Sequence, residues 1–385
     1  MEIIKFVDSH YLLRCIKLRC MYVVVGGGVV GLFTAYYLSR EGADVVLIEA
    51  ESLAHSSRAA AGVLEFTKFE LNRINVRGYA SRYLKMIING KAAIRRIDPL
   101  WLLTYLKVYG RDPDPSVWTF MSEMAQFSKR EYFRLAEESN DFELREEPVF
   151  EVVEDVEKEV EALKKDPLRP RFEVGELDGR QVIVYLDAVI VSTDLLAERL
   201  SRELKNVRIL KGRVAHYGDG YVVLEDGSKI EAEGVVFSSG WWCRKLGIPV
   251  APLKGYGVRA TTSKRPSRAI ADFVRGVFVV PFTKWVKITG RFDVDPYGDL
   301  KYLPPVLEAA RHWAGDINAF DIAVGFRPCT PDGLPVLEKR GGVVIATGTC
   351  RLGWTYGPAM GKIAAELALG KRGDSPLSAR RFAAR

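Results

Sequence analysis

The chain has 385 residues, and its 48% hydrophobic and 27% charged residues describe an ordinary globular protein that is long enough for two domains. Its net charge of +7 is concentrated, because the stretch 73–111 holds nine Lys or Arg residues against Asp98 alone. Such a run can contact an anionic membrane or form a solvated face, but nucleic-acid binding is disfavoured because no recognised binding module accompanies it.

The first twenty residues mix apolar side chains with charges, which interrupts any signal-peptide core. Met21 stands directly before the first predicted strand. We therefore expect translation to start at Met21 and residues 1–20 to be a non-native leader.

The stretch 22–50 has the order of a dinucleotide-binding unit. Residues 23–25 predict a strand, Gly26, Gly28 and Gly31 have G-x-G-x-x-G spacing, 32–40 predict a helix, and 45–48 predict a second strand that ends at Glu49. The glycines allow a tight turn and close approach of a pyrophosphate, and the helix start attracts phosphates. Glu49 can accept hydrogen bonds from a ribose. The pattern does not distinguish FAD from NAD. A membrane span over 21–39 is the disfavoured alternative.

Beyond this unit, small residues at 61–63 can let the backbone pass close to a flat ligand. Helices are predicted up to residue 134, and the apolar stretch 100–109 either packs in the core or, through Trp101 and Tyr105, meets a membrane interface. An amphipathic helix is predicted over 152–165 and another over 194–204. Asp226-Gly227 predicts a hairpin.

The second half of the chain reads mainly as strands, at 207–210, 235–238, 253–262, 276–281 and 286–292, the last three typical of an antiparallel sheet. Residues 343–347 predict a strand, 348–353 a turn and 354–369 a helix, so that a second helix start would face the site. The five cysteines show no C-x-x-C or zinc spacing, and their odd number argues against a complete disulfide framework. Reduced thiols are expected, with heat-adapted organisms as a known exception. The four histidines form no ligand pair, so no metal is assigned.

Four stretches of the chain together resemble the FAD-dependent amine and amino-acid oxidoreductases, which include D-amino-acid oxidase, glycine oxidase and the D-amino-acid dehydrogenases. They are GGGVVG with LIEA, SSRAAAGVLEF (56–66), GFRPCTPDGLPVLE (325–338) and ATGTCRLGWTYGPAMG (346–361). PLKGYGVRA (252–260) and Arg381-Phe382 add weaker matches, and 352–355 resembles the D-amino-acid dehydrogenase branch most. Relatives usually have Gly-His-Gly where this chain has Gly348, Thr349 and Cys350, a departure that bears on fine tuning near the flavin rather than on its binding.

The resemblance implies an α/β protein with a Rossmann-like FAD-binding domain (21–98, 186–247 and 326–385) and a second, antiparallel-sheet substrate domain (99–185 and 248–325). The cofactor would be FAD. The residues expected to contact it are Gly26, Gly28, Val29, Val30, Gly31, Glu49, Ala50, Ser57, Arg58, Ala61, Gly62, Val63, Val214, Gly240, Gly353, Trp354 and Thr355.

Arg327 is the candidate substrate anchor. Pro328 favours an extended backbone before it, and 330–333 reads as a turn, so Arg327 is expected at a strand end facing a cavity. A guanidinium holds a carboxylate by two charge-assisted bonds, and the resemblance implies the same role. The alternative is a structural ion pair with a local acid. By similarity, Tyr256 either contacts the substrate through its hydroxyl or has a structural partner.

The expected function is oxidative deamination of a small amino acid, such as D-proline, with electrons passed to a quinone or a dye. Alternatives are a sarcosine- or glycine-oxidase-type enzyme, an L-proline dehydrogenase, and a non-catalytic flavin protein docked on a membrane through 73–111. We expect a cytoplasmic protein, with peripheral contact to the inner face of the membrane as a variant. The sequence does not indicate an oligomeric state.

Overall fold

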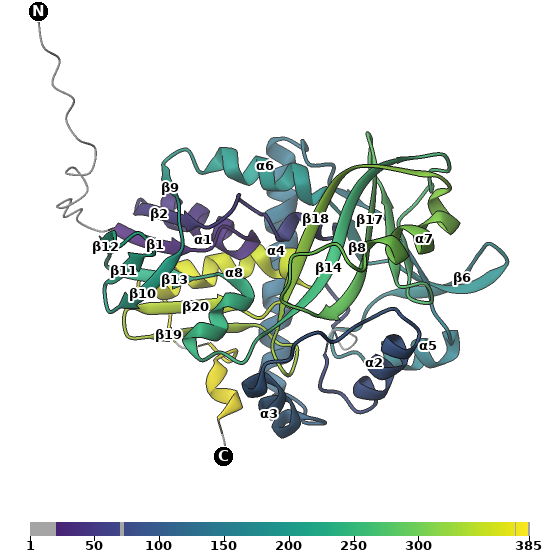
Figure 1. The fold of residues 1–385 in the computed structure, drawn as a ribbon, viewed down its shortest axis with the longest axis horizontal. Helices are drawn as coiled ribbons and strands as arrows, with labels where there is room; N and C mark the ends of the chain where they lie inside the picture. The colour runs from purple at the N-terminus through teal and green to yellow at the C-terminus, as the bar shows by residue number, and fades with distance from the viewer. Residues whose placement is uncertain (1–20, 70–72, 374, 384–385) are drawn as a thin grey trace, which may run out of the picture.

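The computed structural model describes residues 21–69, 73–373 and 375–383 (Figure 1). The predicted leader, 1–20, lies outside the described residues. Among the described residues, no helix combines the length and the hydropathy that a membrane crossing would need.

The first half of the fold is a six-stranded sheet in the order β19-β20-β13-β1-β2-β9, parallel except for the β19–β20 pair. Its strands are β1 (Met21–Val25), β2 (Asp44–Glu49), β9 (Val207–Lys211), β13 (Gly234–Phe237), β19 (Val336–Arg340) and β20 (Val343–Thr347). Helices α1 (Val29–Arg40) and α8 (Gly353–Ala368) pack side by side on this sheet (Figure 1). This arrangement confirms the predicted Rossmann-like domain.

Close packing of α1 against α8 depends on glycine. A Cβ atom on Gly361 would lie 2.5 Å from Phe33 Cβ, and one on Gly357 would lie 2.7 Å from Val29 Cγ2. Both helices follow parallel strands, β1 and β20, so their N-terminal ends lie at the same edge of the sheet. The other face of the sheet packs against the small sheet β10 (Val214–Gly218), β11 (Tyr221–Leu224) and β12 (Lys229–Glu231), whose β11–β12 pair confirms the Asp226-Gly227 hairpin.

The second half is an eight-stranded sheet in the order β18-β14-β17-β16-β15-β5-β7-β6, antiparallel apart from the β15–β5 pair. Its strands are β5 (Val149–Val152), β6 (Phe172–Leu177), β7 (Arg180–Tyr185), β14 (Ala251–Thr262), β15 (Ile270–Asp272), β16 (Val277–Pro281), β17 (Val286–Val294) and β18 (Ile317–Cys329). Helix α7 (Leu303–Ala314) covers one face. The predicted antiparallel second sheet is therefore confirmed.

The remaining elements connect or flank the two sheets. A fourth sheet pairs β3 (Val63–Glu65), β8 (Ala188–Ile190) and β4 (Arg145–Glu146). The other helices are α2 (Tyr79–Ile88), α3 (Pro99–Val108), α4 (Pro115–Glu138), α5 (Val156–Lys164), α6 (Thr193–Glu203), and the short 3₁₀ segments η1 (Ser57–Ala59), η3 (Gly240–Leu246) and η4 (Ala379–Phe382).

The expected start of one of these helices was wrong. The helix expected over 152–165 begins only at Val156, because Val152 still belongs to β5 and the Asp155 side chain accepts a hydrogen bond from Lys158 N at 3.0 Å and so caps the helix. Helix α4 falls in the stretch assigned to the second domain, yet its apolar side packs on α1 and α8 of the first. Burial against a distant partner, not position in the sequence, decides where α4 belongs.

Candidate active site

Two helices begin where the cofactor is expected, and in neither does the N-cap residue itself supply a side-chain cap. The N-cap residues are Gly28 for α1 and Leu352 for α8. Helices α2 and α7 also lack a side-chain cap, whereas Asp or Ser side chains cap α3, α4, α5 and α6. A helix start presents N–H groups and the positive end of the helix dipole. The two uncapped starts can therefore take an anionic or polar group of a ligand.

The loop between β1 and α1 fits a pyrophosphate. Gly26 has φ of 103°, and a Cβ atom on Gly31 would lie 1.8 Å from the carbonyl oxygen of Gly26, so the fold itself requires these two glycines. Gly28 differs, because a Cβ atom there would meet only Ser57 Oγ, at 3.3 Å. The protein does not need glycine at 28, which leaves this position free to serve a ligand that approaches the backbone.

Glu49 lies against this loop. Its Oε2 accepts a hydrogen bond from Gly27 N at 2.6 Å, and its Oε1 accepts one from Glu51 N at 2.8 Å. The carboxylate is thus fixed beside the glycine loop at the end of β2, where the ribose of a dinucleotide is expected, with Ala50 next to it.

Segment 57–65 joins α8 to the glycine loop. Ser57 Oγ accepts a hydrogen bond from Val29 N at 3.0 Å, and Ser57 O accepts one from Trp354 Nε1 at 2.9 Å. Thr355 Oγ1 accepts a bond from Glu65 N at 3.3 Å. The structure therefore brings together most of the residues that the sequence proposed for the cofactor, including the neighbouring Val30, Val63 and Gly353.

The other proposed cofactor residues are placed differently. Gly62 packs its backbone on β8, where a Cβ atom would lie 2.0 Å from Val191 O, and Ala61 precedes it. Arg58 pairs with Asp321 of β18 at 2.9 Å, so its guanidinium is turned to the second sheet. Val214 packs with the small sheet, and Gly240 O accepts a bond from Thr347 Oγ1 at 2.8 Å. Contacts of these residues with FAD remain proposals.

The second sheet approaches the cofactor segment closely. A Cβ atom on Gly257 would lie 2.4 Å from Ala59 O, and one on Gly325 would lie 2.7 Å from Ala59 Cβ. Glycines in β14 and β18 thus let these two strands, of which β18 carries Arg327, touch the segment that continues from the cofactor loop.

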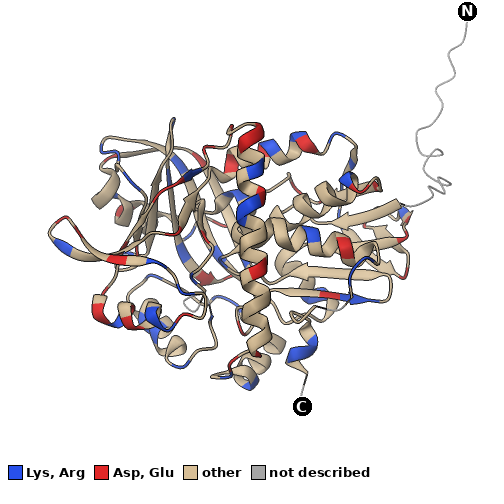
Figure 2. Cartoon of the chain, turned by 180° about the vertical axis from the view of Figure 1, so that it is seen from behind, with Lys and Arg blue, Asp and Glu red and all other residues tan. Residues whose placement is uncertain are grey.

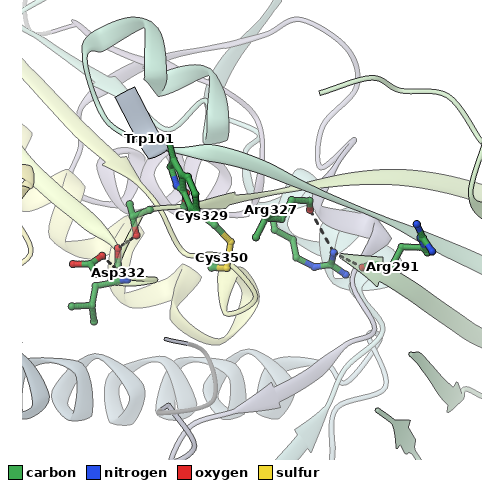
Figure 3. Close-up of a disulfide and its surroundings, with 9 residues drawn as sticks. Trp101, Arg291, Arg327, Cys329, Asp332 and Cys350 are labelled. Atoms are coloured by element: carbon green, nitrogen blue, oxygen red, sulfur yellow. Dashed lines mark hydrogen bonds between the residues drawn. A yellow bond between two sulfur atoms is a disulfide. The ribbon is translucent and has the colours of Figure 1, made fainter. Parts of the chain in front are cut away.

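Arg327 lies in β18, two residues before its end, and is partly buried (Figure 3). Its Nη1 donates to Arg291 O at 3.0 Å, with a longer contact to Leu253 O at 3.5 Å. Its Cζ is 5.3 Å from the centre of the Phe292 ring. Among the described residues, no carboxylate lies within 4.0 Å of the guanidinium. The structural ion pair that was the alternative for this arginine is therefore not formed.

Burial, with the nearby charge of Arg351, lowers the pKa of Arg327 to about 10. The side chain is still a cation at neutral pH, and the negative charge of Asp293 offsets the lowering of its pKa only in part. A substrate carboxylate would supply further negative charge through two parallel hydrogen bonds. Whether Arg327 faces a cavity, as the sequence suggested, stays a prediction.

The hydrogen bond from Arg327 depends on the backbone conformation of Arg291. Its φ is 73°, a left-handed conformation that is rare for residues other than glycine, and the β14–β17 register shifts beside it. The Arg291 side chain is anchored by Asp293 at 2.7 Å. The bulge frees the Arg291 carbonyl oxygen to accept the bond from Arg327. Sequence reasoning missed this residue because nothing in its local pattern signals a bulge.

Gly255 of β14 lies beside the Arg327 guanidinium, where a Cβ atom would be 2.5 Å from Arg327 Nη1 and 2.9 Å from Gly290 O. We expect Gly255→Ala to displace the guanidinium and raise the substrate KM roughly tenfold, the loss of about one hydrogen bond of this group, with FAD content unchanged. Steady-state kinetics and the flavin absorbance measure both. Gly298→Ala is the matched control, since a Cβ atom there meets nothing within 4 Å. An unchanged KM in Gly255→Ala would contradict this placement.

Tyr256 has a structural role here. It is fully buried, and its hydroxyl donates to Asp299 O and accepts from Tyr302 N, both at 3.2 Å. These bonds hold the loop between β17 and α7 against β14. The structure thus favours the structural alternative over a contact with the substrate.

A disulfide bond joins Cys329 to Cys350, so the expectation of reduced thiols was wrong for these two residues. They are separated by 21 positions in the sequence, with no spacing that signals a bond. Cys243 is free and buried. Trp101 is 8% exposed and donates from Nε1 to Cys329 O at 2.8 Å, which confirms core packing for this side chain.

The turn after Arg327 forms as expected, with a bond from Gly333 N to Thr330 O at 3.1 Å. Arg381, near the end of the chain, donates from Nε and Nη2 to both Asp332 carboxylate oxygens, at 2.7 and 3.1 Å. The weak sequence match at Arg381 thus marks a residue that holds the turn after Arg327 in place. Over the described residues, no cluster of three metal-ligating side chains is found.

A parallel sheet with a glycine loop before its first helix and an acid at the end of its second strand is the arrangement of a dinucleotide-binding domain. The chain belongs to the FAD-dependent oxidoreductase family, whose model, described as "FAD dependent oxidoreductase", matches residues 21–367. FAD is accordingly its cofactor, and the uncapped starts of α1 and α8, with Gly28, are the features that fit it.

Individual relatives agree with this assignment. The chain is 50% identical to a D-proline dehydrogenase of Pyrobaculum islandicum, over 93% of this chain and 98% of the relative. It is 27% identical to D-amino acid dehydrogenase 2 of Pseudomonas aeruginosa, over 91% and 95%. Its fold matches that of iminodiacetate oxidase from Chelativorans sp. BNC1 with a TM-score of 0.69, at 19% identity, over 94% of this chain and 98% of that one. At that identity the structural match concerns the fold alone.

Proposed function

We propose that the protein oxidises a small D-amino acid, such as D-proline, at the bond between the α-carbon and the nitrogen. The observation that carries this proposal is Arg327, a cation that has no carboxylate within 4.0 Å among the described residues and that lies on a strand packed against the cofactor segment. The 50% identity to a D-proline dehydrogenase supports the substrate class.

Bound FAD supplies the acceptor for the hydride of the α-carbon. The protein itself orients the reactants. Arg327 holds the carboxylate and so fixes the α-carbon. The start of α8 would offer N–H groups and the positive end of its dipole to the reduced cofactor. The lone pair of a neutral amine assists departure of the hydride, so the reaction does not require a side-chain base.

Anaerobic bleaching of the flavin tests the proposal. D-proline, L-proline, sarcosine and glycine are mixed separately with the holoenzyme, and turnover is then followed with and without an artificial dye. We expect D-proline to bleach the flavin fastest and turnover to require the dye. Bleaching by L-proline, or by sarcosine and glycine with oxygen as acceptor, would instead support the related activities. No bleaching by any of the four would favour a non-catalytic flavin protein.

We also propose a quinone as the natural acceptor, reached by peripheral contact with a membrane. Helix α3 turns Trp101, Thr104 and Val108 inward, and it leaves apolar side chains exposed on its other side. The exposed residues are Leu100 (48%), Leu102 (37%), Leu103 (60%) and Leu106 (64%). Lys107 and Arg111 follow in the sequence. Helices α2 and α3 both lie at the lower edge of the molecule in Figure 1. Figure 2 shows, from behind, where basic and acidic residues lie along the chain. Exposed leucines beside basic residues suit an anionic membrane surface.

We expect Leu103→Glu/Leu106→Glu to lose binding to anionic vesicles while dye-linked activity in solution stays unchanged. Two buried leucine side chains are worth about 3–6 kcal/mol of transfer free energy, enough to abolish sedimentation with lipid. Co-sedimentation with vesicles that do or do not contain anionic lipid measures this. A double variant that still sediments, or a wild-type protein that binds neither vesicle type, would refute the contact.

A further inference from the structure

The Cys329–Cys350 disulfide joins the two parts of the proposed site (Figure 3). Cys329 is the last residue of β18, two positions after Arg327. Cys350 lies in the loop between β20 and α8, three positions before Gly353, where α8 begins. The bond therefore connects the strand that carries the substrate anchor to the loop that leads into the second cofactor-facing helix.

Cys350 has a backbone conformation that cysteine rarely adopts. Its φ is 45°, in the left-handed region where side chains other than glycine are disfavoured. A glycine would fit this backbone without strain. What a cysteine adds, and a glycine could not, is the covalent bond to Cys329.

The position of the Arg327 guanidinium depends on where the end of β18 lies. No described carboxylate within 4.0 Å fixes the guanidinium, and its shorter hydrogen bond is to a carbonyl oxygen of β17. Around the disulfide, Cys350 N donates to Pro328 O at 2.9 Å, and Cys329 pairs with Thr349 in a β-bridge. Disulfide and backbone bonds together link the strand end and the loop over only a few residues.

We infer that the disulfide is a positioning element, and Cys329 and Cys350 positioning residues, that hold Arg327 in register with the start of α8. Without the covalent bond, the strand end and the loop can shift relative to each other, and the carboxylate would be held out of line with the cofactor. Both residues are buried, with 0% and 4% exposure, under Trp101. Attack by a thiolate needs access to a sulfur, so we expect a static bond rather than a reversible switch.

The double variant Cys329→Ala/Cys350→Gly tests this inference, because glycine keeps the left-handed backbone. The KM for D-proline, kcat, and the Kd of pyrrole-2-carboxylate, read from the flavin spectrum, are compared with those of the wild type. We expect KM and Kd to rise roughly tenfold, as for a displaced binding group, with kcat changed less than threefold and FAD content unchanged. Cys243→Ala, which removes the buried free thiol and keeps the disulfide bond, should leave KM and Kd unchanged.

A double variant whose KM and Kd stay within twofold of the wild type, while its thermal unfolding temperature falls, would overturn the inference and leave the bond a simple staple. If this variant does not fold, the single variant Cys329→Ser is measured instead, because it breaks the same bond and leaves Cys350 and its loop unchanged. We expect the same rise of KM and Kd. A folded Cys329→Ser enzyme whose KM and Kd stay within twofold of the wild type would also overturn the inference.

This inference rests on the proposed function, but the two can fail separately. If no amino acid bleaches the wild-type flavin, the proposed oxidation fails. If the wild type binds the carboxylate and the double variant binds it equally well, the positioning role fails.

Discussion

Replacing Arg327 by alanine is expected to lower kcat/KM for the amino acid roughly 10²- to 10⁴-fold while the protein keeps its FAD. The guanidinium would hold the carboxylate through two charge-assisted hydrogen bonds, each worth about 1.5–3 kcal/mol, and about 1.4 kcal/mol corresponds to tenfold in rate or affinity. FAD should remain because the side chain contacts β14 and β17, not the glycine loop. Steady-state kinetics and flavin absorbance of the purified variant measure both quantities.

Two further variants serve as comparisons for Arg327→Ala. Arg327→Lys keeps the charge but loses the planar fork, so its kcat/KM should fall between the wild type and Arg327→Ala. Arg208→Ala removes an exposed arginine of β9 and should change neither kinetics nor FAD content. An Arg327→Ala enzyme with wild-type kcat/KM would remove Arg327 from the site.

The second large effect is expected at Gly28, where Gly28→Ala should lose FAD without unfolding the protein. A Cβ atom on Gly28 has only Ser57 Oγ near it, at 3.3 Å, so the apoprotein tolerates it, but it would occupy the path of the pyrophosphate. Overpacking of a contact costs about 1–3 kcal/mol, or roughly 5- to 150-fold in FAD affinity. Thermal unfolding with and without added FAD shows the difference, since a ligand stabilises only the form that binds it.

Gly31→Ala is the contrasting variant. Its Cβ atom would lie 1.8 Å from the Gly26 carbonyl oxygen, so the β1–α1 turn itself cannot form as it is. We expect a loss of stability that is already present without FAD. If Gly28→Ala lowered the unfolding temperature of the apoprotein as much as Gly31→Ala does, Gly28 would be a residue of the fold and not of the cofactor site.

Local patterns were enough to predict the first part of the fold. Glycine spacing, β-branched runs and the following acid placed β1, α1, β2 and Glu49, although α1 starts at Val29, three residues earlier than expected. Each of these features is decided by residues close in the sequence. The antiparallel strands of the second sheet and the hairpin at Asp226-Gly227 were found for the same reason.

Contacts between distant residues could not be predicted in this way. The disulfide joins positions 21 apart, the fit of Gly255 beside Arg327 depends on the register of β14 against β18, and the left-handed Arg291 depends on a bulge between β14 and β17. Similarly, the hydroxyl of Tyr256 forms its hydrogen bonds with a loop more than forty positions away in the sequence. Tertiary packing, which no short stretch encodes, sets each of these.

The most direct test is a crystal structure of the FAD-loaded protein with bound pyrrole-2-carboxylate, a flat carboxylate that cannot be oxidised like proline. We predict that the Arg327 guanidinium binds this carboxylate through two hydrogen bonds and that the ring lies against the flavin. A carboxylate bound by another cation, or Arg327 turned away from the flavin, would contradict the account.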